Sequence, residues 1–182
     1  MKKLLFALTL MVSVLSMAQD KLPYYEIPDP AKSYTAGSIA ARMVDGLGFR
    51  YYWASEGLRA EDLSYKAAES ARTSGETIDH ILALTNVILK SVSDETIVDV
   101  KTLTTFEAKR SQTLWNLKKA SDILNATEDI SKFDNDKFPF WNIINGPIAD
   151  AIWHCGQLVT LRRASGNPFT SNVNLFTGRL KK

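Results

Sequence analysis

Apolar residues recur at helical spacing in four stretches of this 182-residue chain. The first stretch runs from about residue 34 to residue 57, and its apolar positions are four residues apart. This spacing places them on one face of a helix and predicts an amphipathic helix packed against a core. The positions are Ile39, Met43, Leu47 and Tyr51.

The second stretch opens with Thr73-Ser74-Gly75-Glu76, in which Thr73 and Glu76 have the spacing of a capping box. The Thr73 hydroxyl can accept a hydrogen bond from a backbone N–H of the first turn, and Glu76 can reach back to the cap. A helix is therefore predicted from residue 73 to about residue 91.

A third helix is predicted over residues 104–125. Beside its apolar positions it carries a face of four cations, which we expect to be solvated: Lys109, Arg110, Lys118 and Lys119.

A last helical region is predicted over residues 139–165, interrupted by Gly146-Pro147. Pro147 has no N–H and clashes with the preceding turn, so the helix either kinks there or begins anew with Pro147 in its first turn. Gly166-Asn167-Pro168 ends the region. The tail over residues 169–182 has no helical period and is expected to pack across the helices.

Four helices without a strand-like alternating segment predict an all-α protein with a four-helix bundle. Residues 34–182 are expected to form this single domain. Residues 19–33 contain three prolines and are expected to be an extended segment that leads into it.

Residues 1–18 have the features of a secretory signal peptide. Lys2 and Lys3 precede an apolar run from Leu4 to Leu15, and Ser16 and Ala18 provide small residues for cleavage. Export is therefore predicted, which would place a bacterial chain in the periplasm or outside the cell. An uncleaved apolar anchor is the alternative.

Charge and cysteine content exclude several classes of function. The whole chain has 22 basic and 20 acidic residues, and without Lys2 and Lys3 the two numbers are equal. No basic patch then indicates nucleic acid or, after signal cleavage, a membrane surface as a partner.

Cys155 is the only cysteine and is expected to be a buried apolar side chain.

The chain has only two histidines, His80 and His154, and both fall on stripes that are expected to point inward. Asp150 precedes His154 by four residues, so the two share one helix face. If the two helices face each other, the three side chains meet as two nitrogen ligands and one oxygen ligand for a divalent cation. The alternatives are a hydrogen-bonded core histidine and a surface Asp–His ion pair.

The segment from Trp153 to Leu158, continued by Leu161-Arg162 and Gly166-Asn167-Pro168, resembles the last helix of the DinB-like (DinB/YfiT-like) superfamily. The segment from Thr73 to Ile81 resembles the histidine-bearing second helix of that superfamily. Its members are metal-dependent proteins with a four-helix bundle, and some are transferases or an isomerase that use low-molecular-weight thiols.

The resemblance implies that His80 and His154 are metal ligands, while Asp150 stands where the superfamily usually has another histidine. The implied ion is Zn²⁺, Ni²⁺, Mn²⁺ or Fe²⁺, with Gln157 hydrogen-bonded to a ligand from outside the coordination sphere. Arg162 is expected to cap or pair near a helix end. No catalytic residue is assigned.

A metal-dependent hydrolase or thiol transferase acting on a small molecule follows from the resemblance, with a homodimer expected from similar proteins. The alternative is a non-catalytic binding or stress-related module with a degenerate metal site.

Overall fold

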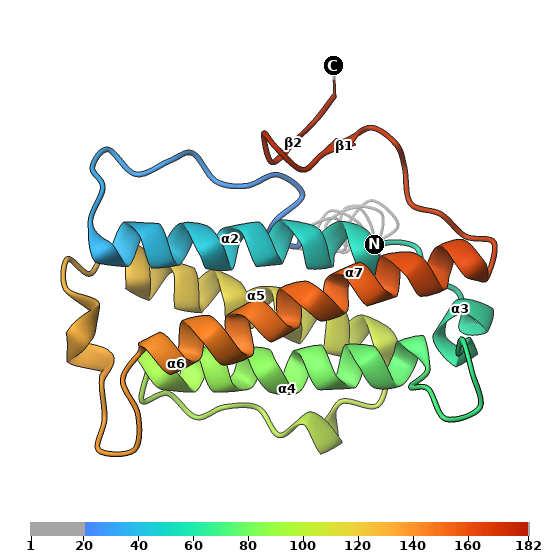
Figure 1. Ribbon diagram of the computed structural model, residues 1–182, viewed down its shortest axis with the longest axis horizontal. Helices are drawn as coiled ribbons and strands as arrows, with labels where there is room; N and C mark the ends of the chain where they lie inside the picture. Colours follow the sequence, from blue (N-terminus) through green and yellow to red (C-terminus); the bar gives the residue numbers. More distant parts are fainter. Residues whose placement is uncertain (1–20, 182) are drawn as a thin grey trace, which may run out of the picture.

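The computed structural model describes residues 21–181, and these are mainly helical. The prediction of an all-α protein is confirmed. The predicted signal peptide and the first two residues of the extended segment lie outside the described residues. Among the described residues, no helix is both long and apolar enough to cross a membrane. Four long helices dominate Figure 1: α2 (Ala36–Ser55), α4 (Ser74–Val92), α5 (Phe106–Asn125) and α7 (Ala149–Ala164).

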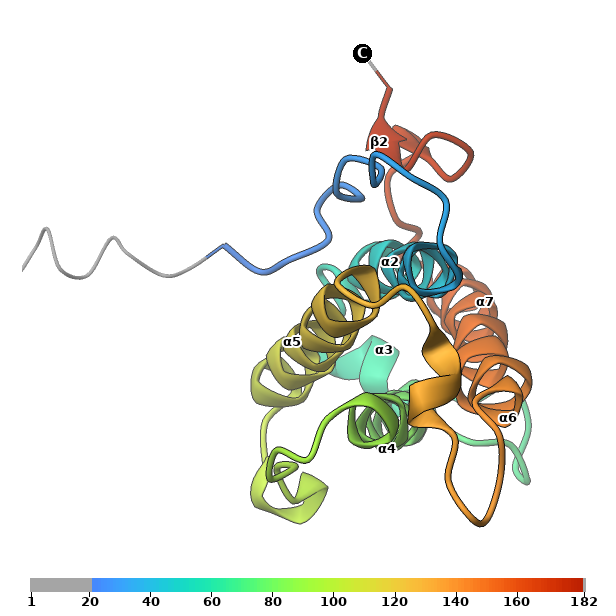
Figure 2. The ribbon, with the colours of Figure 1, turned by 90° about the vertical axis from the view of Figure 1, so that its left-hand side faces the viewer.

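The four long helices pack side by side, and each contacts two neighbours. Helix α2 packs on α5 and α7, and α4 packs on the same two helices from the other side. Figure 2 shows this arrangement end-on. Helices α4 and α5 run in the same direction, because the connection between them returns along α4 before α5 begins (Figure 1). This connection contains the short helix η1 (Val100–Thr102).

The core is formed by apolar side chains from all four helices. Burial of a large apolar side chain contributes about 1.5–3 kcal/mol. The predicted core face of α2 is confirmed at Leu47 and Tyr51, but it shifts at the start of the helix, where Ile39 is 54% exposed and Ala40 is buried. Gly37 explains the shift, because a Cβ there would lie 1.9 Å from the Thr127 carbonyl oxygen, so this face of α2 packs closely on the end of α5. Fully buried residues include Leu47, Phe49, Tyr51, Ile81, Leu114, Leu117, Leu124 and Ile148.

Helix α4 begins as predicted. The Glu76 N–H donates to Thr73 Oγ1 (3.1 Å), and the Thr73 N–H donates to the Glu76 carboxylate (2.8 Å). This capping box is confirmed. The stretch between α2 and α4 contains the short helix α3 (Ala60–Ser64).

The last helical region continues through Pro147 instead of stopping there. Helix α6 (Trp141–Ile143) passes into a π-helical turn, η3 (Ile144–Ile148), which leads directly into α7. The wider π turn accommodates the missing N–H and the bulk of Pro147 without breaking the helix. The 3₁₀ helix η2 (Ile130–Phe133) lies in the connection before α6.

The C-terminal tail contains a hairpin that the sequence did not predict, with strands β1 (Val173–Asn174) and β2 (Arg179–Leu180) paired antiparallel. This hairpin contacts the segment that precedes α2. The Ile27 N–H donates to the Gly178 carbonyl (2.9 Å), and Arg179 pairs with Glu26 (2.7 Å).

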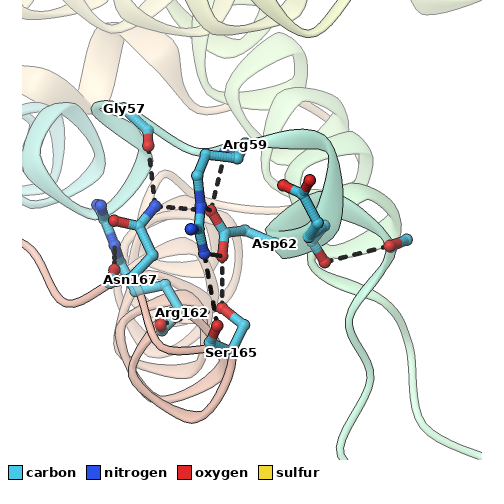
Figure 3. A network of polar contacts seen from close by, with 8 residues as sticks. Gly57, Arg59, Asp62, Arg162, Ser165 and Asn167 are labelled. Carbon is cyan, nitrogen blue, oxygen red and sulfur yellow. Dashed lines mark hydrogen bonds and ion pairs between the residues drawn. The ribbon is translucent and has the colours of Figure 1, made fainter.

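One end of the molecule is held by a buried carboxylate, Asp62 of α3, which is 0% exposed (Figure 3). It accepts hydrogen bonds from the side chains of Arg59, Ser165 (2.6 Å) and Asn167 (2.6 Å). These contacts tie α3 to the C-terminal end of α7.

Arginine side chains satisfy the last carbonyl groups of α2. Arg162 donates to the carbonyl oxygens of Trp53 (3.0 Å) and Ala54 (3.1 Å), which confirms its expected role near a helix end. Arg110 was expected on a solvated face, but it is 9% exposed and donates to the Tyr52 carbonyl while it pairs with Glu56. The solvated interpretation of Arg110 is therefore wrong, because the end of α2 provides acceptors that face it.

Candidate metal centre

Helices α4 and α7 bring His80, Asp150 and His154 together. One ligand atom from each residue lies within 4.8 Å of the others. The Nε2 atom of His80 lies 3.3 Å from Asp150 Oδ2, and the Nε2 atom of His154 lies 3.3 Å from Asp150 Oδ1. The two imidazole rings are perpendicular, with centroids 4.6 Å apart. The carboxylate therefore lies against both histidines at once.

The cluster lies at the seam between α4 and α7, not inside the core as the inward stripes had indicated. The side chains of His80, Asp150 and His154 are 30%, 44% and 14% exposed. Helix α4 packs on α5 as well as on α7. Its core face therefore centres on residues such as Ile81, and His80 falls on the border that faces α7. A small molecule from solvent can reach this position.

Gln157 controls the orientation of His154. Its amide oxygen lies 2.8 Å from His154 Nδ1. Because an amide oxygen only accepts hydrogen bonds, the contact places a proton on Nδ1. The other ring nitrogen, Nε2, faces Asp150 and is the atom that would bind a metal ion.

The donor set fits a divalent transition metal ion. Imidazole nitrogen and carboxylate oxygen bind Zn²⁺ at about 2.0–2.2 Å in tetrahedral geometry, so two ligand atoms on one ion are about 3.3–3.6 Å apart. The ligand atoms of the cluster lie within 4.8 Å of one another, so side-chain shifts of about 1 Å bring them to this spacing. Three protein ligands leave further coordination positions open, as in catalytic sites. The cluster can thus hold a metal ion.

The neighbouring thiol is not part of this donor set. Cys155 is 2% exposed and, as predicted, lies in the apolar core. Burial raises the pKa of its thiol to about 12, so it stays protonated at neutral pH.

Sequence reasoning missed a second ion pair beside the cluster. Lys109 of α5 lies 2.6 Å from the carboxylate of Asp79, the residue before His80. The two residues are on different helices and no local motif connects them, so only the packing of α4 on α5 reveals the pair.

Fold and site together define a helical protein with a candidate metal centre at a helix seam. Comparisons of the chain with protein-family models, with curated proteins and with solved structures gave no match.

Proposed function

We propose that this chain is an exported metalloprotein with a DinB-like four-helix bundle, in which His80, Asp150 and His154 hold one divalent cation. The convergence of these three side chains from two helices is the observation that carries the proposal. A lone histidine on a helix is commonly structural, but the only two histidines of the chain lie against the same carboxylate.

Two further features support the DinB-like assignment. The four long helices form a closed ring of contacts, as in a bundle. The segment from His154 to Leu158, which carries the sequence resemblance, lies on α7 at the seam, where His154 and Gln157 contact each other.

The chemistry at this site would depend on a bound divalent cation. Such a cation acts as a Lewis acid and lowers the pKa of a bound water or thiol toward neutrality. The chain's own contribution is positional: Gln157 holds the proton of His154 on Nδ1, and Asp150 supplies negative charge while its side chain stays 44% exposed. We propose hydrolysis of a small molecule ahead of thiol transfer, because export separates the protein from cytosolic thiol cofactors.

Asp150 sets the metal preference. A carboxylate in place of a third imidazole makes the donor set harder, which favours Mn²⁺ or Fe²⁺ relative to an all-histidine site. An Asp150→His variant should therefore shift the preference toward Zn²⁺ and Ni²⁺.

A non-catalytic module with a degenerate site is the second candidate. It is favoured by one detail: each Asp150 oxygen contacts a different imidazole, which is also the pattern of a hydrogen-bonded His–Asp–His ion pair. In that case the cluster joins α4 to α7 without an ion.

Elemental analysis of tag-free protein, prepared without chelator, distinguishes the two. We expect close to one transition metal ion per chain in the wild type, with most of it lost in His80→Ala and in Asp150→Ala. Asp136→Ala, an exposed aspartate outside the cluster, is the matched control and should keep the metal. A metal-free wild type would exclude the proposal, and equal metal content in all variants would exclude this ligand set.

A further inference from the structure

A groove of about 520 Å³ lies away from the candidate metal centre and shares no residue with it. It is bordered by the segment from Pro28 to Tyr34, the N-terminal half of α2 and the C-terminal half of α5. This volume is within the range of about 300–1,000 Å³ that is typical of small-molecule sites. Its apolar lining includes Pro28, Pro30, Ala31, Ile39 and Met43.

Asp45 of α2 lines the groove although it is only 7% exposed. Both hydrogen bonds to its carboxylate end on the same oxygen. Tyr24 donates its hydroxyl to Oδ1 (3.1 Å), and Ser121 donates to Oδ1 at 2.6 Å. From residues 21–181 no donor reaches Oδ2, so this oxygen keeps its capacity to accept hydrogen bonds.

The other charged side chains of the lining already have partners. Asp122 pairs with Lys118, Asp29 pairs with Arg179 (2.6 Å), and Arg42 donates to the Pro28 carbonyl at 2.7 Å. Within the described part of the chain, Asp45 is the carboxylate of this lining that lacks a salt bridge.

A buried carboxylate without a cation is costly. Desolvation raises the pKa of Asp45, and the hydrogen bonds from Ser121 and Tyr24 and the charges of Arg42 and Lys118 only partly oppose it. Tyr24 and Ser121 need only a neutral acceptor, which an asparagine would also provide. Arg42 and Lys118 act on this charge only from a distance, and within residues 21–181 no cation forms a salt bridge with the Asp45 carboxylate.

We propose that the groove binds a small organic ammonium compound. Its N–H groups donate to Asp45 Oδ2, and its apolar body lies against Ile39, Met43 and the proline-containing segment. An ammonium group supplies a positive charge in direct contact with the carboxylate and donors for Oδ2, because it carries up to three N–H groups and no acceptor. This site is independent of the metal centre and of the function proposed for it.

Binding of 2-phenylethylammonium, followed by amide chemical shifts in NMR titrations, tests the proposal, with 2-phenylethanol as the neutral probe of similar shape. We expect the ammonium compound to shift amides of residues 38–45 and 118–125, and to bind about tenfold or more tightly than the alcohol. Asp45→Asn keeps an acceptor for Tyr24 and Ser121 and should reduce ammonium binding by a similar factor.

Asp136→Asn removes an exposed carboxylate outside the groove and should leave the titration unchanged. Equal binding of the two probes to the wild type, or unchanged ammonium binding in Asp45→Asn, would overturn the proposal. It would also be overturned if the ammonium compound did not shift these amides at all, which would leave Asp45 as an anchor for Tyr24.

Discussion

Replacement of Asp62 by alanine should strongly destabilise the end of the molecule where α3 contacts the C-terminal end of α7. The carboxylate is 0% exposed and accepts five hydrogen bonds, three from Arg59 and one each from Ser165 and Asn167. The Asp62→Ala variant loses all five and leaves these donors without their acceptor.

The expected loss is smaller than the sum of five charge-assisted hydrogen bonds. The Arg59 side chain is 52% exposed and can be hydrated again, so its share is largely recovered. Ser165 and Asn167 are more enclosed, and their contacts join α3 to the end of α7. We therefore expect the free energy of unfolding to fall by about 2–4 kcal/mol.

Urea denaturation followed by circular dichroism measures this change. Asp122→Ala is the matched control, because Asp122 forms an exposed pair with Lys118 one turn away and such pairs contribute about 0.3–0.5 kcal/mol. A loss below about 1 kcal/mol for Asp62→Ala, or a loss equal to that of the control, would refute the reasoning from burial.

The same network makes stability depend on pH. The side chain of Arg59, followed by Ser165 and Asn167, holds the pKa of Asp62 well below its usual range. Because the folded-state pKa is depressed, the unfolded chain takes up the proton first, near its ordinary pKa of about 3.9. This stabilisation is present above about pH 4 and is lost as the pH falls below it. Asp62→Ala should lose less stability than the wild type between pH 5 and pH 3, measured by urea denaturation at each pH.

Three further predictions concern the candidate site and the helices. Gln157→Ala should lower zinc affinity about 10–100-fold in a chelator competition, because His154 loses its orienting partner; unchanged affinity would contradict this. Gly37→Ala should lower the melting temperature, because its Cβ would meet the Thr127 carbonyl. Gly156→Ala is the control: its Cβ would face open space, and the variant should stabilise the helix by about 0.5–1 kcal/mol. The opposite order of the two variants in thermal denaturation would refute the close packing at Gly37. Thr73→Ala should cost about 1 kcal/mol in urea denaturation, and no loss would mean that the capping box does not stabilise α4.

Local patterns predicted the helices well where their signals lie within a few residues. The Thr73 capping box places the start of α4 correctly, and the third helix ends at Asn125 as predicted. The π turn at Pro147 was not predictable, because kink, restart and π turn all satisfy the same missing N–H. The hairpin of the tail was not predicted either, because its short strands carry no alternating pattern. The hairpin is stabilised by contacts with Ile27 and Glu26, which lie near the other end of the chain.

For the candidate site, sequence spacing identified the residues but not their environment. The four-residue separation of Asp150 and His154 places them on one face of α7 whatever the fold. The burial of His80 depends on how α4 is rotated between α5 and α7, which its own sequence does not specify, and the site therefore lies at the seam. Arg110 was missed for the same reason, because its partners come from α2, and the burial of Asp62 depends on Ser165 and Asn167 from the end of α7.

An anomalous difference map from crystals grown with zinc tests the metal centre most directly. We predict one strong peak at the seam of α4 and α7, about 2.0–2.2 Å from the Nε2 atoms of His80 and His154 and from one oxygen of Asp150. A map without a peak at this seam, or with its peak on other residues while His80 and His154 still pair with Asp150, would contradict the metal site.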